Sequence, residues 1–383
     1  MKPRIWVDAT TIVNQIDGLS HYIVGLLMHM PEEAFKTFEI SVLINPAINR
    51  PDVEELITSN KFNIVTASIA PIGPQRDWDL GWFLLRNKKK FDIFHSTSTQ
   101  YPLFLKGGIA TVHDLTFKKY FNGRFYKVGL AKMYLNLICR HAAKHADVIV
   151  AVSNSTSADL LKYYKNVNGL KEKSIVVHEG WEHIENEADF MITQNIPCKN
   201  YFFYLGSSRI HKNLHGLLNA FEIALSRLPE DINLLISGNM SLLSKVEKLK
   251  VDKINSQGER IFFSGVIPPT ELSSYYKNAR AFIFPSFSEG FGLPILESFY
   301  FKVPLLCSNI SSFPEIAGDA ALYFNPFDVN EMAKAMVNII EEKELAEVLV
   351  NKGTKRLKLF SWKQASQNIF SMYQSLAKKK KYI

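Results

Sequence analysis

The sequence predicts an α/β protein made of two doubly wound, parallel-sheet domains. Short apolar runs alternate with stretches of helical periodicity along the chain, which is typical of stacked βα units. The alternation restarts near Tyr201, so the 383 residues divide into two series of similar length, each long enough for a domain of roughly 150 residues. Hydrophobic residues make up 47% and charged residues 21% of the chain, a balance that argues against a disordered or fibrous protein.

Each series predicts one domain. Residues 1–180 have expected strands at 5–7, 40–44, 62–67, 93–95, 109–112 and 148–152, and residues 201–361 have them at 201–206, 234–238, 261–265, 281–285 and 303–307. Residues 181–200 break the alternation with acidic side chains and Pro197, and we interpret them as a linker. The segment 362–383 is expected to return to the first domain as a helix and to end in a basic tail. Because open parallel sheets bind ligands beyond the carboxyl ends of their strands, we expect the two domains to face a central cleft that holds the ligand.

The charge distribution indicates anionic partners. The formal net charge is +8, and part of the excess lies in two lysine runs, 88–90 and 378–381. These runs could hold the protein at an anionic membrane surface, or they are solvated segments without a partner, and the sequence leaves both interpretations open. Aromatic residues follow the predicted core elements and form no stripe with basic residues, so no nucleic-acid partner is expected.

Targeting and metal signals are not found in the sequence. No run of about 20 apolar residues predicts a membrane-spanning helix, and the first residues lack the features of a signal peptide. We therefore expect a cytoplasmic protein, peripheral at the inner face of the plasma membrane if the lysine runs bind lipid. The three cysteines are widely separated and no zinc-ligand spacing occurs, so no metal site is predicted.

The most informative stretch is residues 285–297, Pro-Ser-Phe-Ser-Glu-Gly-Phe-Gly-Leu-Pro-Ile-Leu-Glu. A buried strand leads into a glycine loop and then into a helix that Pro294 can begin, and such a helix N-terminus attracts anions. Glu289 precedes this helix and Glu297 is expected in its first turn, so two carboxylates could each accept hydrogen bonds from sugar hydroxyls. This pattern suits a phosphate between two polyols, as in a nucleotide sugar. A single glutamate in a first helical turn is also common without a ligand.

Two cations follow the first strand of the second domain. Arg209 and Lys212 lie between the strand at 201–206 and the next helical pattern, where they could neutralise a departing diphosphate without a metal. The structural alternative is that both side chains are solvated.

Polar residues also follow strands of the first domain. His113 and Asp114 come directly after the strand at 109–112 and could contact the transferred sugar or the acceptor hydroxyl, although a histidine at a strand end is often a satisfied turn residue. Gly18 lies in a turn that opens the first helix. Ser153 follows the strand at 148–152, and helix capping is an adequate explanation for it.

One Asp-x-Asp triplet, Asp77-Trp78-Asp79, has the form of a motif that binds a divalent cation in some enzymes. A helical pattern follows it and no apolar strand runs into it, so we interpret the two acids as residues of a helix start.

Together these residues resemble glycosyltransferase family 4, retaining enzymes of the GT-B fold with two Rossmann-like domains. The resemblance is carried by the run from Glu289 to Glu297, by the segments 263–266 and 311–321, and by the shorter segments 111–114 and 152–153. It covers the C-terminal half almost completely and the N-terminal half more thinly.

The resemblance implies a role for each matching residue. Glu289, Lys212, His113 and Arg209 would be catalytic, with Glu289 holding the donor sugar and Lys212 the diphosphate. Glu297 would bind the ribose and Val266 would border the base. The acceptor side would include Asp114 and Ser153. The remaining donor-binding residues would be Gly18, Ser207, Gly290, Phe291, Gly292 and Leu293.

The function that this resemblance implies is hexose transfer. The segment 311–321 is similar to that of mannosyl- and rhamnosyltransferases, so we expect a mannose-like hexose, as in GDP-mannose, to pass to a saccharide or lipid-linked acceptor in polysaccharide or lipopolysaccharide biosynthesis. The family likeness implies retention of configuration with no metal and no cofactor. Two alternatives remain open: a nucleotide-sugar epimerase or phosphorylase on the same scaffold, and a basic binding protein without catalysis.

Overall fold

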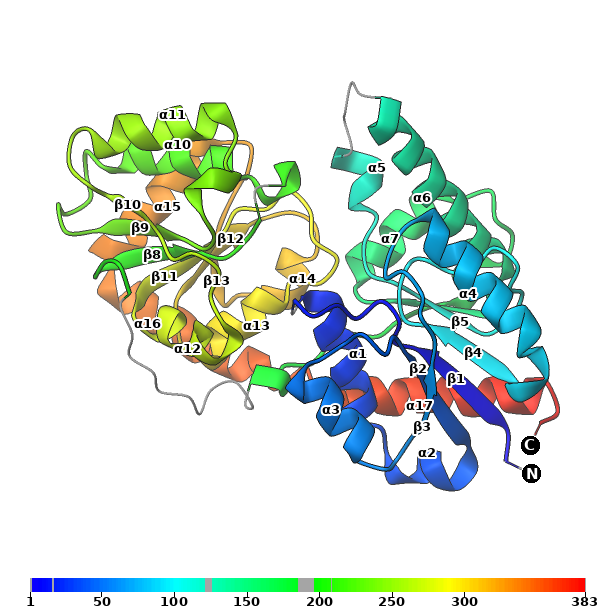
Figure 1. Cartoon of the computed structure of the whole chain (residues 1–383). Coiled ribbons are helices and arrows are strands. Elements are labelled where there is room, and N and C mark those ends of the chain that lie inside the picture. The colour runs from blue at the N-terminus through cyan, green and yellow to red at the C-terminus, as the bar shows by residue number, and fades with distance from the viewer. Residues whose placement is uncertain (1, 16, 121–125, 185–195, 208, 383) are drawn as a thin grey trace. The chain divides into compact units, whose positions relative to one another are not determined.

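The computed structural model describes residues 2–15, 17–120, 126–184, 196–207 and 209–382. It divides into two compact units (Figure 1). Unit 1 comprises Met1–Gly180 and Ser361–Ile383, and unit 2 comprises Trp181–Phe360. Of the linker predicted at 181–200, residues 185–195 lie outside the described residues.

The described part of unit 1 contains a seven-stranded sheet in the order β3-β2-β1-β4-β5-β6-β7. Neighbouring strands are parallel. The strands are β1 Arg4–Asp8, β2 Glu39–Ile44, β3 Asn63–Thr66, β4 Ile93–Ser96, β5 Ile109–Val112, β6 Val148–Ala151 and β7 Ser174–Val176. The strand order therefore reverses between β1 and β4, which is the doubly wound pattern that the sequence predicts.

Helices connect these strands. They are α1 Gly18–Met28, α2 Glu32–Thr37, α3 Pro51–Thr58, α4 Pro74–Arg86, the 3₁₀ helix η1 Lys88–Lys90, α5 Thr116–Tyr120, α6 Tyr126–His145, α7 Asn154–Tyr163 and α8 Leu170–Lys173.

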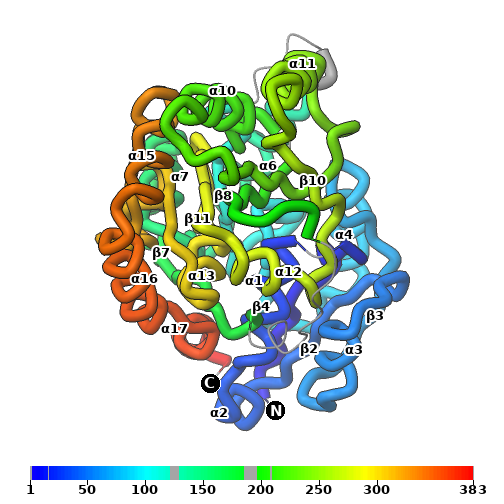
Figure 2. Tube along the Cα trace, turned by 90° about the vertical axis from the view of Figure 1, so that its left-hand side faces the viewer, coloured from blue at the N-terminus to red at the C-terminus, as the bar shows by residue number. Residues whose placement is uncertain are grey.

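The C-terminal helix α17 (Trp362–Lys379) also belongs to unit 1. It packs against α1, as Figures 1 and 2 show. In this contact Gly25 makes room for Trp362, because a Cβ on this glycine would lie 2.5 Å from the indole. Three turns further along α17, the Tyr373 hydroxyl forms a hydrogen bond with His95 Nδ1 at 2.8 Å. The end of the chain thus completes the core of unit 1.

The described part of unit 2 contains a six-stranded parallel sheet in the order β10-β9-β8-β11-β12-β13. The strands are β8 Tyr201–Tyr204, β9 Asn233–Ile236, β10 Ile261–Phe263, β11 Ala279–Phe284, β12 Leu305–Ser308 and β13 Ala321–Phe324. The helices are η2 Ile210–Lys212, α10 Leu214–Ala224, η3 Met240–Leu242, α11 Lys245–Asn255, α12 Pro269–Lys277, α13 Leu293–Tyr300, α14 Phe313–Ala317, α15 Val329–Glu341 and α16 Lys343–Leu357.

Helix α15 shows how the sequence specifies this packing. The Asp328 side chain accepts hydrogen bonds from the first backbone N–H groups of the helix, which caps it. Met332, Met336 and Ile339 recur at spacings of four and three and are buried on one face. Helices α10 and α15 lie side by side in Figures 1 and 2. None of the described helices is long and apolar enough to cross a bilayer.

Candidate functional site

Two predicted residues of unit 2, Lys212 and Glu289, lie where β8 and β11 end. These strands are hydrogen-bonded neighbours in the centre of the sheet, although β9 and β10 separate them in the sequence. The strand order reverses at this point, and open α/β sheets bind ligands at such positions. The loop after β8 carries Lys212, and the loop after β11 carries Glu289.

Lys212 and Glu289 form an ion pair. The Lys212 Nζ lies 2.7 Å from Glu289 Oε1, and 21% and 15% of the two side chains remain exposed. The ammonium also lies 5.5 Å from the centroid of the Phe284 ring, in a cation–π contact. Both charges are therefore held at the strand ends but are still within reach of a ligand.

Asn213 fixes the loop that carries Lys212. Its side-chain amide donates to the carbonyl oxygens of Pro285, at 3.1 Å, and Pro326, at 2.9 Å. The next helix allows this because Gly216 has no Cβ, which would lie 2.3 Å from Asn213 Oδ1. Asn213 was not predicted as a site residue. The only feature of the sequence that points to it is its position directly before a helical pattern.

Two serines after β12 hold the loop that carries Glu289. The Ser311 hydroxyl accepts a hydrogen bond from the Glu289 N–H at 3.1 Å and donates to the Glu289 carbonyl at 2.9 Å. The Ser312 hydroxyl donates to the Phe291 carbonyl at 2.8 Å. Both serines lie in the segment 311–321 that resembles the family, but the sequence does not predict their hydrogen bonds to the backbone of Glu289 and Phe291.

The glycine loop has the predicted form. Gly292 has a φ of +106°, which favours glycine, and α13 begins directly after it with Pro294 in the first turn. Gly290, Phe291 and Leu293 lie along the same turn between Glu289 and the helix.

The prediction that Glu297 lies in the first helical turn is wrong. Helix α13 begins at Leu293, so Glu297 lies in the second turn, and the first turn contains no acidic residue. The Glu297 side chain is buried and accepts a hydrogen bond from the Tyr276 hydroxyl at 2.7 Å. Burial raises the pKa of Glu297 to about 7, although the Tyr276 hydrogen bond opposes this rise.

Three other predicted residues of unit 2 lie on loops. Ser207 and Arg209 follow β8 and are exposed, with Arg209 directly before η2. Val266 follows β10 and is 71% exposed. All three are on loops that follow the carboxyl ends of the strands, and their contacts with the donor stay a prediction.

In unit 1, His113 lies directly after β5, as predicted. Its Nε2 is 2.8 Å from the carbonyl oxygen of Thr97, and its Nδ1 is 3.5 Å from a carboxylate oxygen of the buried Glu179. Burial alone would lower the pKa of His113, but the hydrogen bond and charge of Glu179 raise it above 6.5. Glu179 was not predicted, since nothing local in the sequence connects it to His113.

The remaining predicted residues of unit 1 make structural contacts. Asp114 accepts a hydrogen bond from the Thr116 N–H at 2.8 Å, and Ser153 caps α7 by accepting one from the Thr156 N–H at 3.0 Å. The Thr156 hydroxyl in turn donates to the His113 carbonyl at 3.0 Å. Gly18 is the first residue of α1. The carboxyl ends of the strands thus bring these residues to one edge of the sheet, whereas their placement with the unit 2 residues around one cleft stays a prediction.

The Asp-x-Asp triplet is part of a helix, as predicted. Asp77 lies in the first turn of α4, is buried, and accepts a hydrogen bond from Tyr134, while Asp79 accepts one from Gln75 at 2.7 Å. Across the described ranges, no group of three or more His, Cys, Asp or Glu side chains is placed to hold a metal ion.

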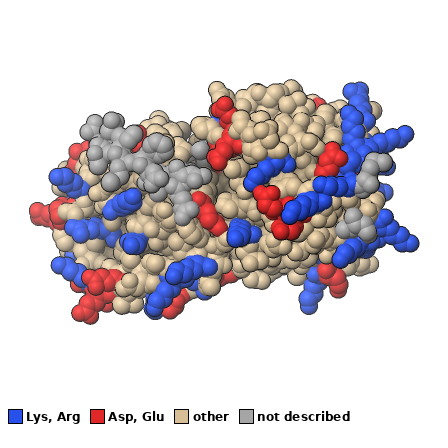
Figure 3. All heavy atoms as spheres, turned by 90° about the horizontal axis from the view of Figure 1, so that it is seen from below, with Lys and Arg blue, Asp and Glu red and all other residues tan. Residues whose placement is uncertain are grey.

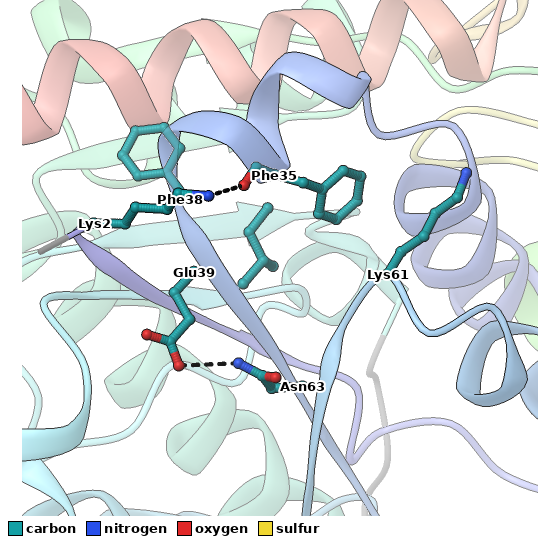
Figure 4. Close-up of a pocket in the computed structure, with 7 residues that line it drawn as sticks. Lys2, Phe35, Phe38, Glu39, Lys61 and Asn63 are labelled. Atoms are coloured by element: carbon teal, nitrogen blue, oxygen red, sulfur yellow. Dashed lines mark hydrogen bonds between the residues drawn. The ribbon is translucent and has the colours of Figure 1, made fainter.

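A shallow pocket of about 300 Å³ lies elsewhere in unit 1 (Figure 4). It is lined by residues at the start of β2 and β3, including Glu39, whose carboxylate accepts a hydrogen bond from the Asn63 amide at 3.0 Å. Lys2 donates to the Phe35 carbonyl at its rim at 2.7 Å. The pocket is therefore at the amino ends of the strands and contains no predicted site residue.

Comparison with known proteins shows what this chain is similar to. Residues 186–356 match the family model of the group 1 glycosyl transferases. The chain is 26% identical over 303 residues to the O-antigen chain mannosyltransferase B of Escherichia coli, covering 76% of each protein. It is 29% identical over 265 residues to the O-antigen chain mannosyltransferase RfbU of Salmonella typhimurium, covering 67% of this chain and 68% of that protein.

The fold is shared with solved structures. A sucrose-phosphate synthase from Thermosynechococcus elongatus aligns with a TM-score of 0.70 and 15% identity over 98% of this chain and 99% of its own. The predicted fold class, GT-B with two Rossmann-like parallel-sheet domains, is confirmed.

Proposed function

We propose that this chain is a group 1 glycosyltransferase, an enzyme that transfers a sugar, here mannose or a related hexose, from a nucleotide-sugar donor to a saccharide acceptor. The match of residues 186–356 to the family model supports this. The names of both curated relatives support mannose and a role in surface polysaccharide synthesis. We further propose GDP-mannose as the donor, a saccharide or lipid-linked acceptor, and peripheral association with the inner face of the plasma membrane.

One observation carries the proposed mechanism: the ion pair between Lys212 and Glu289 at the meeting point of β8 and β11. A diphosphate that binds beside Lys212 offers the ammonium a second anionic partner, which leaves the Glu289 carboxylate free to accept hydrogen bonds from hydroxyls of the donor sugar. Arg209 and the N-terminus of α13 add positive potential on the same loops. These fixed charges would stabilise the diphosphate as it departs.

The proposed reaction proceeds with retention. The acceptor hydroxyl forms its bond to the anomeric carbon on the face from which the diphosphate leaves, the carbon–oxygen bond to the diphosphate breaks, and the hydroxyl proton passes to the departing phosphate oxygen. A double displacement would need two carboxylates about 5 to 5.5 Å apart, one serving as a nucleophile below the sugar. Glu297 is unsuited to that role because it is buried and bonded to Tyr276. The family resemblance assigns it to the ribose instead.

The experiment that tests this proposal combines a donor screen with product analysis. Thermal shift against nucleotide sugars should single out GDP-mannose, since a ligand at 100 times its Kd adds about 2.7 kcal/mol of stability. Labelled GDP-mannose with a lipid-linked saccharide should then give a mannoside with the anomeric configuration of the donor, in the presence of a chelator. Conversion of the donor without acceptor would indicate an epimerase instead. Salt-sensitive DNA binding without donor turnover would indicate a binding protein.

A further inference from the structure

Unit 1 exposes an apolar surface on α4, α6 and the loop between β4 and β5. We define this apolar face by six exposed side chains: Trp78, Trp82, Leu85, Phe104, Met133 and Leu137. Those on α4 recur at spacings of four and three, and those on α6 at a spacing of four, so each helix presents its residues on one side. Trp78 is 55% and Met133 63% exposed.

Contacts between rings make the α4 part of this face continuous. The Trp78 ring lies 6.1 Å from that of Trp82 and 6.0 Å from that of Phe104. Phe104 rests on α4 at Gly81, where a Cβ would come within 2.7 Å of its ring. A glycine in the middle of a helix lowers the stability of that helix. Here the lack of a Cβ leaves space for the exposed Phe104 ring.

Two hydrogen bonds join α6 to the same surface. Tyr134, next to Met133, donates to Asp77, next to Trp78. Further along α6, His141 Nε2 bonds the Leu105 carbonyl at 3.1 Å, one residue after Phe104. The six side chains therefore belong to one connected part of unit 1.

Basic residues border the apolar face. The Arg86 guanidinium lies 5.6 Å from the Trp82 ring centroid, the lysines of η1 follow at once, and Lys106 and Lys144 are exposed on the neighbouring loop and on α6. The sequence of α6 contains no Asp or Glu. Figure 3 shows basic side chains gathered along its right-hand edge, the edge on which Figure 1 labels α4 and both chain ends.

Both lysine runs lie at the end of unit 1 where its strands begin. Arg4 donates to the Lys89 carbonyl at 2.6 Å, which places the start of β1 beside η1. At the end of α17, the Lys380 Nζ lies 2.8 Å from Asp147 and 2.9 Å from the position of a Cβ on Gly107. The tail thus lies beside the loop that carries Lys106 and adds positive charge to the same end of unit 1.

We propose that the apolar face is a docking surface for an anionic lipid bilayer. Tryptophans take positions at the headgroup level, aliphatic side chains enter the acyl boundary, and lysines and arginines bind lipid phosphates around them. A second copy of this chain fits less well, because a symmetric contact would bring two basic borders together. This docking surface rests on the peripheral membrane association proposed above and assigns it to the six side chains of the apolar face.

Vesicle binding of the full chain tests this docking surface. Sedimentation with vesicles of 30% phosphatidylglycerol in phosphatidylcholine should show binding that pure phosphatidylcholine vesicles and 0.5 M salt reduce at least tenfold. Exposed tryptophans are found only at positions 78 and 82 among the five in the chain. Brominated lipids should therefore quench the tryptophan fluorescence of the wild type. The W78F/W82F variant should bind the vesicles normally but lose most of that quenching.

Serine variants separate docking from the reaction. W78S/W82S and M133S/L137S should bind anionic vesicles at least tenfold more weakly, whereas V246S/L249S, which removes two exposed apolar residues of α11, should bind as the wild type does. K88Q/K89Q/K90Q should weaken binding more than K343Q/K355Q/K358Q, which removes three exposed lysines of unit 2. All should keep their melting temperature and their turnover with a soluble acceptor.

Unchanged vesicle binding in both serine variants would overturn the inference. So would a wild-type dimer that these variants convert to monomers, since the face would then bind a second copy. Failure of sugar transfer with intact vesicle binding would reject the proposed reaction alone.

Discussion

Lys212 and Glu289 are 77 residues apart in the chain, and their side chains are 2.7 Å apart in the structure. Each is carried by a loop at the end of a central strand, β8 or β11. The Lys212 loop is fixed by the amide of its own Asn213, which donates to the Pro285 carbonyl, and the Glu289 loop is fixed by the Ser311 hydroxyl. The pair is therefore preorganised before any ligand binds, which reduces the ordering that a bound diphosphate would require.

Removing the cation should impair turnover more than stability. We expect Lys212→Ala to lower kcat on the order of 10²- to 10³-fold, the scale for losing one preorganised charge. The matched control is Lys250→Ala, because Lys250 forms an equally short 2.7 Å pair with Glu222 at 22% exposure but lies away from the strand ends. Steady-state kinetics of nucleotide diphosphate release would measure both. Equal kcat values in the two variants would reject the role of Lys212.

Glu297 gives the protein a pH-dependent stability. Its folded pKa is about 7 against an ordinary 4.5, so the folded state binds more protons between these values and stability falls as the pH rises through that window. At about 1.4 kcal/mol per pKa unit, the penalty above pH 7 is roughly 3 kcal/mol. Glu297→Gln should remove it, giving a more stable protein at pH 8 and little change at pH 4.5, measured by chemical denaturation. A gain of the same size at both pH values would contradict the burial of the charge.

Most of the strands could be predicted because they are short runs of buried residues. All four residues of β8, Tyr201–Tyr204, are buried, so the run stands out without any knowledge of its neighbours. The two strands that we missed, β7 and β13, are at sheet edges. The middle residue of β7, Ile175, is 40% exposed. This three-residue strand can be recognised only from its hydrogen bonds to β6, which the sequence does not show.

Only the part of the candidate site that lies in one continuous stretch of sequence could be predicted. The stretch around Glu289 contains its own strand end, glycine loop and helix start, so it could be interpreted alone. Asn213, Ser311 and Glu179 act on residues that tertiary structure brings to them, through an amide, a hydroxyl and a carboxylate. No spacing in the sequence could show these contacts.

Glu179 should control the charge of His113. We expect Glu179→Gln to lower the pKa of His113, because the carboxylate is what offsets the effect of burial. A raised histidine pKa stabilises the fold fully below pH 6.5, and this contribution is lost as the pH rises through the folded value. The variant should therefore lose more stability at pH 6 than at pH 9. NMR titration of the imidazole would check the shift, and Asp114→Asn should move it less, since the charge of Asp114 is the weakest of the contributions that raise it.

Gly292 should tolerate no side chain. Its φ of +106° is unfavourable for an L-residue by about 1–2 kcal/mol, and a Cβ would lie 3.2 Å from Ile295 Cδ1. Gly292→Ala should therefore lower the free energy of unfolding by roughly that amount, and because the loop leads into α13, it should also weaken nucleotide binding. The control is Gly129→Ala in α6, where no atom lies within 4 Å of the new Cβ and alanine should add about 0.5–1 kcal/mol. Urea denaturation and nucleotide titration of both variants would measure this. If Gly292→Ala unfolds and binds nucleotide as the wild type does, the loop adapts freely and its shape is not what holds the anion.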